Sequence, residues 1–135
     1  LDMQAEKRVH DAMRAMLEAG IVESAHDLSD GGLAVTLSEC CTPELGAKVT
    51  VPENANPLFT LFGEAPSRIL ITVNDSDKAA QIAAKFGVDC PVIGAIMKER
   101  LQIGTDRQML IDFSTSGLQQ AFETALPRLL QAQHD

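Results

Sequence analysis

The sequence predicts an α/β fold of the α+β kind, a mixed β-sheet with helices packed on it. Two patterns support this prediction. Segments with helical periodicity alternate with short apolar segments rich in β-branched residues, and three strand-like segments follow one another closely between residues 92 and 113. Hydrophobic residues make up 45% of the 135-residue chain, enough for the core of one domain.

The first third of the chain is predicted to alternate helix and strand. Residues 2–19 place apolar side chains at i, i+3 and i+4 spacing, and Gly20 is the expected C-cap of this helix. Residues 21–28 are predicted to form a short strand. Residues 32–41 are apolar on nearly all sides, so we expect a buried helix that Pro43 brings to an end.

The remaining elements follow from the same two periodicities. The apolar run at residues 68–73 suits a central strand with both faces covered. Ser76 is the expected N-cap of a helix at residues 77–86, and Ser114 or Ser116 that of the last helix. Further strands are predicted at residues 47–51, 92–97, 100–103 and 108–113, and one or two helical turns at residues 58–62.

Composition argues against several classes of protein. The formal net charge of −8 disfavours a nucleic-acid backbone or an anionic membrane as the main partner. No signal peptide is recognisable, and no apolar run approaches the roughly 18 residues of a membrane span. Cys40, Cys41 and Cys90 form no CxxC pair, and the histidines are not spaced as zinc ligands. We therefore expect reduced, buried thiols in a cytoplasmic protein, and no metal site.

The stretch SAHDLSDGGL joins the expected first strand to the buried helix. The first amides of a helix have no internal partner and carry the positive end of the helix dipole. Gly31 and Gly32 lack a Cβ atom, so they would let an anion come close to these amides. A phosphate is the commonest biological anion at such a turn.

The polar residues of this turn admit two interpretations each. Ser29 and Asp30 either cap the helix or contact a ligand, in which case Asp27 or Asp30 would bind a ribose hydroxyl, a metal or a reacting amine. His26 is expected to be a partly buried histidine bonded to backbone, with general acid–base catalysis as the alternative.

A second polar stretch, LFGEAPSR, precedes the apolar run at residues 68–73. Glu64 and Arg68 would contribute little as a surface ion pair. At the start of a central strand, however, Arg68 is well placed to hold an anion through two hydrogen bonds.

The stretches SAHDLSDGGLAVTLSECC and LFGEAPSRILITV together resemble the C-terminal domain of phosphoribosylformylglycinamidine (FGAM) synthase, in its synthetase subunit. The leading QAEKRVHDAMRAMLEAGIVESAHD and the later CPVIGAI fit the same pattern, so the resemblance covers almost the whole chain. The wider superfamily includes aminoimidazole ribonucleotide (AIR) synthetase, so the resemblance implies the fold of the AIR synthetase C-terminal domain. Within it, FGEAPSR and the order His26-Asp27 point to FGAM synthase.

The resemblance implies a ligase of de novo purine biosynthesis. ATP activates the amide oxygen of the substrate FGAR, and ammonia from glutamine then displaces phosphate to give FGAM. No residue of this chain is expected to be catalytic, and His26 is not expected to be the family's catalytic histidine. Substrate binding is implied for a phosphate cradle and for residues beside it: Ser29, Asp30, Gly31, Gly32 and Leu33, and then Asp27, Glu64, Ser67 and Arg68.

The resemblance also implies what lies outside this chain. Because the chain begins at Leu1 and enters a helical pattern at once, we expect residues 1–135 to be one C-terminal domain of a longer synthetase. Its N-terminal domain would bind ATP and Mg²⁺, so no tightly bound cofactor is expected here and the isolated chain should be inactive.

The expected partners are the FGAR phosphate, the N-terminal domain, a glutaminase and a small accessory subunit. Self-association is a further expectation, through an exposed apolar patch on the first helix or around Phe59 and Phe62. Two alternatives stay open: the same domain of another superfamily member such as AIR synthetase, and a non-catalytic interaction module.

Overall fold

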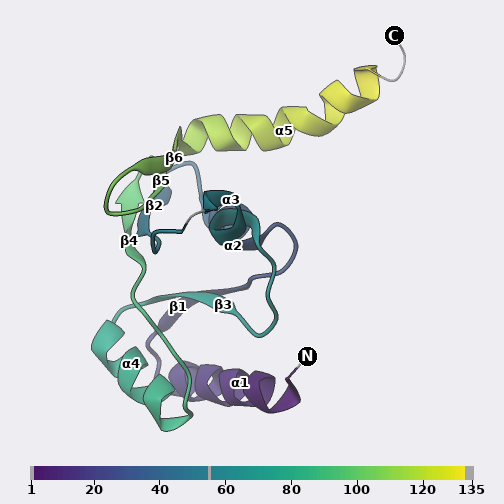
Figure 1. The fold of residues 1–135 in the computed structure, drawn as a ribbon. Helices are drawn as coiled ribbons and strands as arrows, with labels where there is room; N and C mark the ends of the chain where they lie inside the picture. The colour runs from purple at the N-terminus through teal and green to yellow at the C-terminus, as the bar shows by residue number, and fades with distance from the viewer. Residues whose placement is uncertain (1, 55, 133–135) are drawn as a thin grey trace. The chain divides into compact units, whose positions relative to one another are not determined.

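The computed structural model describes residues 2–54 and 56–132. Contacts between residues divide the chain into two compact units, each with its own β-sheet (Figure 1). Helices α2 and α3 belong partly to one unit and partly to the other. Unit 1 comprises Leu1–Thr36 and Leu61–Val92, and unit 2 comprises Leu37–Thr60 and Ile93–Asp135.

The observed elements lie within a few residues of the predicted ones. In chain order they are α1 (Met3–Glu18), β1 (Val22–Asp27), α2 (Gly32–Cys40), β2 (Leu45–Thr50), α3 (Pro57–Phe62), β3 (Ile69–Val73), α4 (Ser76–Lys85), β4 (Gly94–Lys98), β5 (Arg100–Gly104), β6 (Met109–Ser114) and α5 (Thr115–Ala132). The buried helix is confirmed, because Leu33, Ala34 and Leu37 of α2 are all buried.

In unit 1, α1 and α4 pack on the two-stranded antiparallel sheet of β1 and β3 (Figure 1). Buried residues from both helices and from the start of β1 form the core of the unit: Met16, Ile21, Ala79 and Ala83. Partly buried residues of β3, including Ile71 and Val73, pack against this core. One face of the sheet therefore fixes β1 and β3 against the two helices.

Capping residues mark the ends of the helices in unit 1. The Asp2 carboxylate accepts hydrogen bonds from the Gln4 and Ala5 amides of α1. The C-cap of this helix is Ala19 rather than the predicted Gly20, which follows it with a left-handed φ of +72°. The predicted cap of α4 is wrong by one residue. Asp75, not Ser76, has the extended backbone of an N-cap, and its carboxylate accepts the N–H of Lys78.

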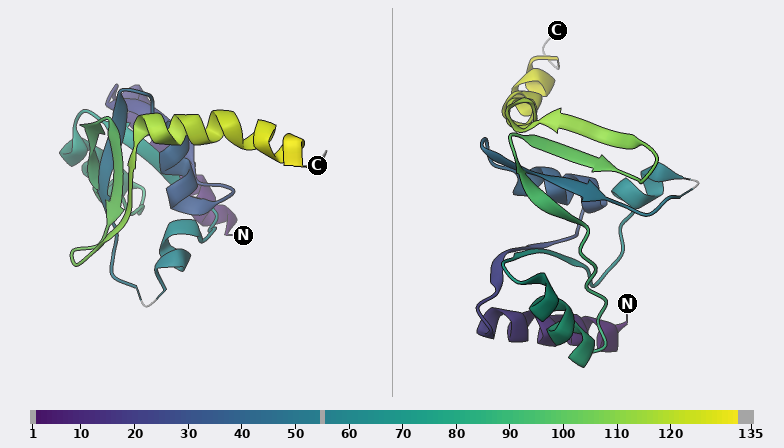
Figure 2. Two further views of the ribbon diagram at one scale, coloured as in Figure 1. Left: turned by 90° about the horizontal axis from the view of Figure 1, so that it is seen from above. Right: turned by 90° about the vertical axis from the view of Figure 1, so that its left-hand side faces the viewer.

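Unit 2 contains the mixed sheet, with strand order β4-β2-β5-β6 (Figure 2). β2 and β5 are parallel, and the other two pairs are antiparallel. The Leu101 and Ile103 side chains of β5 are fully buried. α5 starts directly after β6, where the Ser114 hydroxyl accepts the Gly117 N–H, which confirms one of the two predicted caps.

The α+β class and the mixed sheet are confirmed, but two details of the prediction are wrong. In the described part of the chain the strands form two sheets, and β3 pairs there with β1 alone, so it is not a central strand. An apolar run in the sequence indicates that a strand is buried, but it does not indicate how many strands lie beside it. The three cysteines are free, but the prediction that they are buried is wrong: Cys40 is exposed, and Cys41 and Cys90 are half-buried. Desolvation by partial burial is the main cause that raises the pKa of each thiol.

Within the described part of the chain, no helix has both the length and the apolar character needed to cross a membrane.

The cap of α4 provides a test of the fold. Replacing Asp75 with Ala should lower the free energy of unfolding by about 1 kcal/mol, because the Lys78 amide loses its acceptor. Ser76→Ala is the matched control and should have a much smaller effect. Urea denaturation of both variants measures the difference, and a larger loss for Ser76→Ala would contradict the assignment of the cap.

Candidate functional site

The two polar stretches singled out in the sequence meet at one end of the β1–β3 ladder. Asp27 at the end of β1 pairs with Ile69 at the start of β3. One residue further on, the Leu28 N–H donates to the Arg68 carbonyl at 3.1 Å. The backbone therefore joins the glycine turn to the stretch that carries Glu64, Ser67 and Arg68.

A carboxylate already occupies the first amide of the glycine turn. The Gly31 N–H donates a hydrogen bond of 2.9 Å to Oε1 of Glu64. The amide that was expected to face a bound anion therefore donates to a side chain of the second polar stretch, and binding of an external anion here stays a prediction.

Gly31 and Gly32 both have left-handed backbone conformations, with φ of +85° and +68°. A Cβ atom on Gly32 would lie 2.8 Å from the Gly63 carbonyl oxygen and 2.8 Å from the Phe62 carbonyl carbon. The missing side chain of Gly32 therefore makes room for the protein's own backbone, and the close approach of a ligand stays a prediction. A Cβ on Gly31 would lie only 2.5 Å from a methyl of Val35.

Ser29 and Asp30 are exposed and do not cap α2. Among the described residues, neither side chain forms a hydrogen bond or an ion pair. The capping interpretation is therefore wrong, and the ligand-binding interpretation stays a prediction. Leu33 differs from its neighbours, because its side chain is buried and only its backbone remains for a ligand.

Arg68 is exposed and does not pair with Glu64. Within residues 2–54 and 56–132, its guanidinium takes part in no ion pair. Ser67, directly before it, has a φ of +60°, a strained conformation for a residue with a side chain. The backbone at this point thus holds an unpaired cation beside the glycine turn.

The residues that meet here are predominantly acidic. The two stretches contribute the carboxylates of Asp27, Asp30 and Glu64 and the guanidinium of Arg68. His26 is half-buried, and its Nδ1 lies 2.8 Å from the Asp27 carbonyl oxygen, which confirms the predicted histidine bonded to backbone. Among the described residues, no group of three or more His, Cys, Asp or Glu side chains could hold a metal ion.

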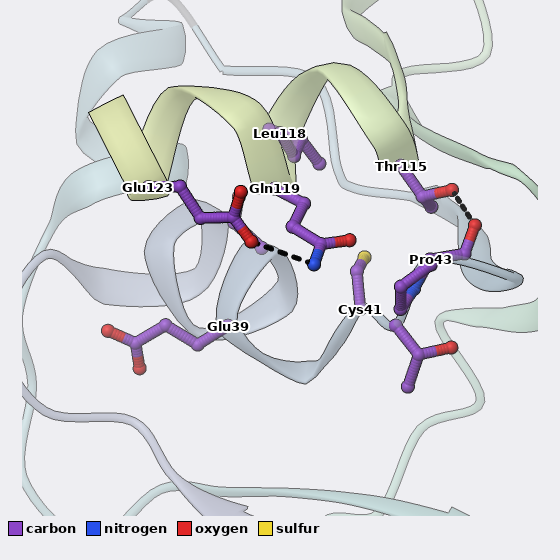
Figure 3. Close-up of a pocket in the computed structure, with 9 residues that line it drawn as sticks. Glu39, Cys41, Pro43, Thr115, Leu118, Gln119 and Glu123 are labelled. Atoms are coloured by element: carbon purple, nitrogen blue, oxygen red, sulfur yellow. Dashed lines mark hydrogen bonds between the residues drawn. The ribbon is translucent and has the colours of Figure 1, made fainter. Parts of the chain in front are cut away.

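Unit 2 contains a pocket of about 520 Å³ that sequence reasoning missed (Figure 3). It forms where the end of α2 and the Thr42-Pro43 turn meet the start of α5, and the Thr115 hydroxyl donates to the Pro43 carbonyl there. Its charged lining residues, Glu39 and Glu123, are both acidic. The described lining offers no cation for a phosphate, and no sequence motif links these distant segments.

Residues 1–106 match the family described as AIR synthase related protein, C-terminal domain. The chain belongs to this family. This match confirms the resemblance to the AIR synthetase superfamily and the predicted fold class.

Proteins named phosphoribosylformylglycinamidine synthase subunit PurL are similar to almost the whole chain. PurL of Anaeromyxobacter sp. (strain Fw109-5) is 36% identical over 144 residues, which cover 97% of this chain and 18% of that protein. PurL of Salinibacter ruber (strain DSM 13855 / M31) is 36% identical over 132 residues, covering 94% of this chain and 18% of that protein.

Solved structures of the Thermotoga maritima enzyme are also similar to this chain. Its phosphoribosylformylglycinamidine synthase II matches with a TM-score of 0.76 and 25% identity, covering 87% of this chain and 22% of that one. The T. maritima PurL complexed with FGAR matches with a TM-score of 0.71 and 25% identity, covering 84% and 20%. The family member described here therefore spans about a fifth of the length of these relatives.

Backbone atoms of Phe62 and Gly63 lie so close to Gly32 that we expect a side chain at this position to destabilise the fold. Gly32→Ala should lower the free energy of unfolding by about 3 kcal/mol, because left-handed strain adds to a clash with the backbone of Phe62 and Gly63. Gly20→Ala is the matched control: its φ is similar, but a Cβ would meet no atom within 4 Å, so we expect about 1 kcal/mol. Equal losses in urea denaturation would contradict a steric role for Gly32.

Proposed function

We propose that this chain is the C-terminal, substrate-binding domain of an FGAM synthase, which converts FGAR, ATP and ammonia to FGAM, ADP and phosphate in de novo purine biosynthesis. The observation that carries the proposal is the similarity to PurL proteins over 94–98% of the chain. A related structure is named as a complex with FGAR, which supports the choice of substrate. Both units together would form this one domain.

We assign the substrate phosphate to the glycine turn. Ser29 and Arg68 are exposed, and the β1–β3 ladder brings their stretches together. In this proposal the Arg68 guanidinium binds the phosphate through paired hydrogen bonds, and the hydroxyls of Ser29 and Ser67 donate to it. The carboxylates of Asp27 and Asp30 would accept hydrogen bonds from ribose hydroxyls, since they repel the phosphate itself.

The chemical step would occur with groups from the rest of a longer synthetase. ATP and Mg²⁺ would bind mainly to its N-terminal domain, and ATP would supply the activation of the FGAR amide. This chain would bind and orient the substrate, so the isolated chain should form no FGAM. A related structure, T. maritima PurL complexed with AMPPCP, supports nucleotide binding by the whole enzyme.

The proposed partners are the N-terminal domain, a glutaminase that delivers ammonia, and a small accessory subunit, all in the cytoplasm. A related structure is named PurLQS, which supports an assembly of this kind. Exposed apolar side chains of α3 fit contact with the N-terminal domain or with a second copy: Leu58 is 65%, Phe59 70% and Phe62 45% exposed.

A chimeric enzyme tests the proposal. We would replace the matching segment of Anaeromyxobacter PurL with residues 1–135 and measure FGAM formed from FGAR, ATP and ammonia. The chimera should be active, and Arg68→Ala within it should raise the KM for FGAR at least tenfold, because a phosphate loses its charged partner.

The control in this experiment is Arg107→Ala, which removes an exposed arginine of unit 2 and should leave the KM unchanged. A chimera that folds and binds ATP but forms no FGAM would contradict the proposal. An active chimera whose KM does not respond to Arg68→Ala would contradict the phosphate assignment alone.

A further inference from the structure

The hydrogen bond between Glu64 and Gly31 places a negative charge where the proposed function places a substrate phosphate. The Glu64 carboxylate accepts the Gly31 N–H at 2.9 Å. One N–H cannot donate a good hydrogen bond to two anions, and two anions at one amide repel each other. The phosphate and the Glu64 carboxylate therefore compete for this amide.

The backbone keeps Glu64 close to this position. Phe62 and Gly63, directly before it, lie against Gly32 so closely that a Cβ there would be 2.8 Å from the Gly63 carbonyl oxygen. Arg68, four residues after it, is tied to Leu28 by a backbone hydrogen bond of 3.1 Å. Both sides of the short segment that carries Glu64 are thus attached to the glycine turn.

The charges around the turn make this competition selective. Exchanging the Glu64 carboxylate for a free phosphate at one amide replaces one charge-assisted hydrogen bond by another and yields little net binding. Either form of phosphate can also contact Arg68, but only a phosphate ester with a ribose offers hydroxyls to Asp27 or Asp30, so the ester gains interactions in this exchange that a free phosphate lacks.

We propose that Glu64 is a positioning and specificity residue: it holds the glycine turn in its binding conformation and excludes free phosphate from the substrate site. The proposal rests on the proposed function for the identity of the substrate. It assigns to Glu64 a role opposite to that of a direct phosphate ligand, because removing its charge improves phosphate binding.

The test uses the ¹⁵N-labelled chain titrated with inorganic phosphate at constant ionic strength, with amide shifts of Gly31, Gly32 and Leu33 as the readout. Glu64→Gln keeps an acceptor for the Gly31 N–H but removes the charge. Its affinity for phosphate at these amides should be at least about fivefold higher than that of the unsubstituted chain, the effect expected for removing one nearby charge in water.

Glu23→Gln is the matched control, because it removes one exposed carboxylate of β1 from the same unit and leaves the turn intact. It should leave phosphate affinity within twofold. Glu64→Ala, which removes the acceptor as well, distinguishes the two parts of the role: it should also bind phosphate more tightly but should lower the melting temperature more than Glu64→Gln.

Phosphate affinity of Glu64→Gln that equals or falls below that of the unsubstituted chain overturns the proposal, and so does an equal gain in Glu23→Gln. These results are separate from those of the chimera. An inactive chimera with a gain in Glu64→Gln would refute FGAM synthesis but keep the competition, whereas an active chimera without that gain would refute the competition alone.

Discussion

The candidate site depends on one constraint, the antiparallel pairing of β1 with β3. Neither polar stretch has the residues of a site by itself: the glycine turn has no cation, and the Glu64–Arg68 stretch has no helix start. The pairing of Asp27 with Ile69 and the hydrogen bond from Leu28 to Arg68 join them. The core of α1 and α4 under the same sheet holds this pairing in place, so the packing of unit 1 determines the geometry of the site.

The glycine pair has a structural role that the sequence alone does not reveal. A left-handed φ at both positions turns the chain sharply from β1 into α2, which only glycine does at low cost. The missing Cβ of Gly32 admits the backbone of Phe62 and Gly63, and this contact brings Glu64 to the Gly31 amide. A turn that looks like an open phosphate loop in the sequence is therefore packed on one side and occupied by a carboxylate.

Sequence reasoning predicted the elements well because local periodicity and capping chemistry determine them. Ser114 caps α5 as expected, and the C-cap of α1 lies one residue before the predicted Gly20. It failed where the outcome depends on residues far apart in the chain: whether the apolar β3 has one neighbour or two, and which group meets the Gly31 amide. Sequence patterns also could not distinguish capping from ligand binding for Ser29, because both roles favour the same residue types.

The negative net charge of the chain has a consequence for ligand binding at the candidate site. A protein of net charge −8 is a poor general receptor for anions, and three carboxylates beside one arginine make the turn itself unfavourable for a free phosphate. An enzyme of the proposed function, which would release phosphate and bind a phosphate ester, would benefit from such a balance. In that proposal, affinity would come from the combination of an ester phosphate at Arg68 and hydroxyl donors at the carboxylates, and neither part would be sufficient alone. Selectivity of this kind requires an acidic turn with a single, correctly placed cation.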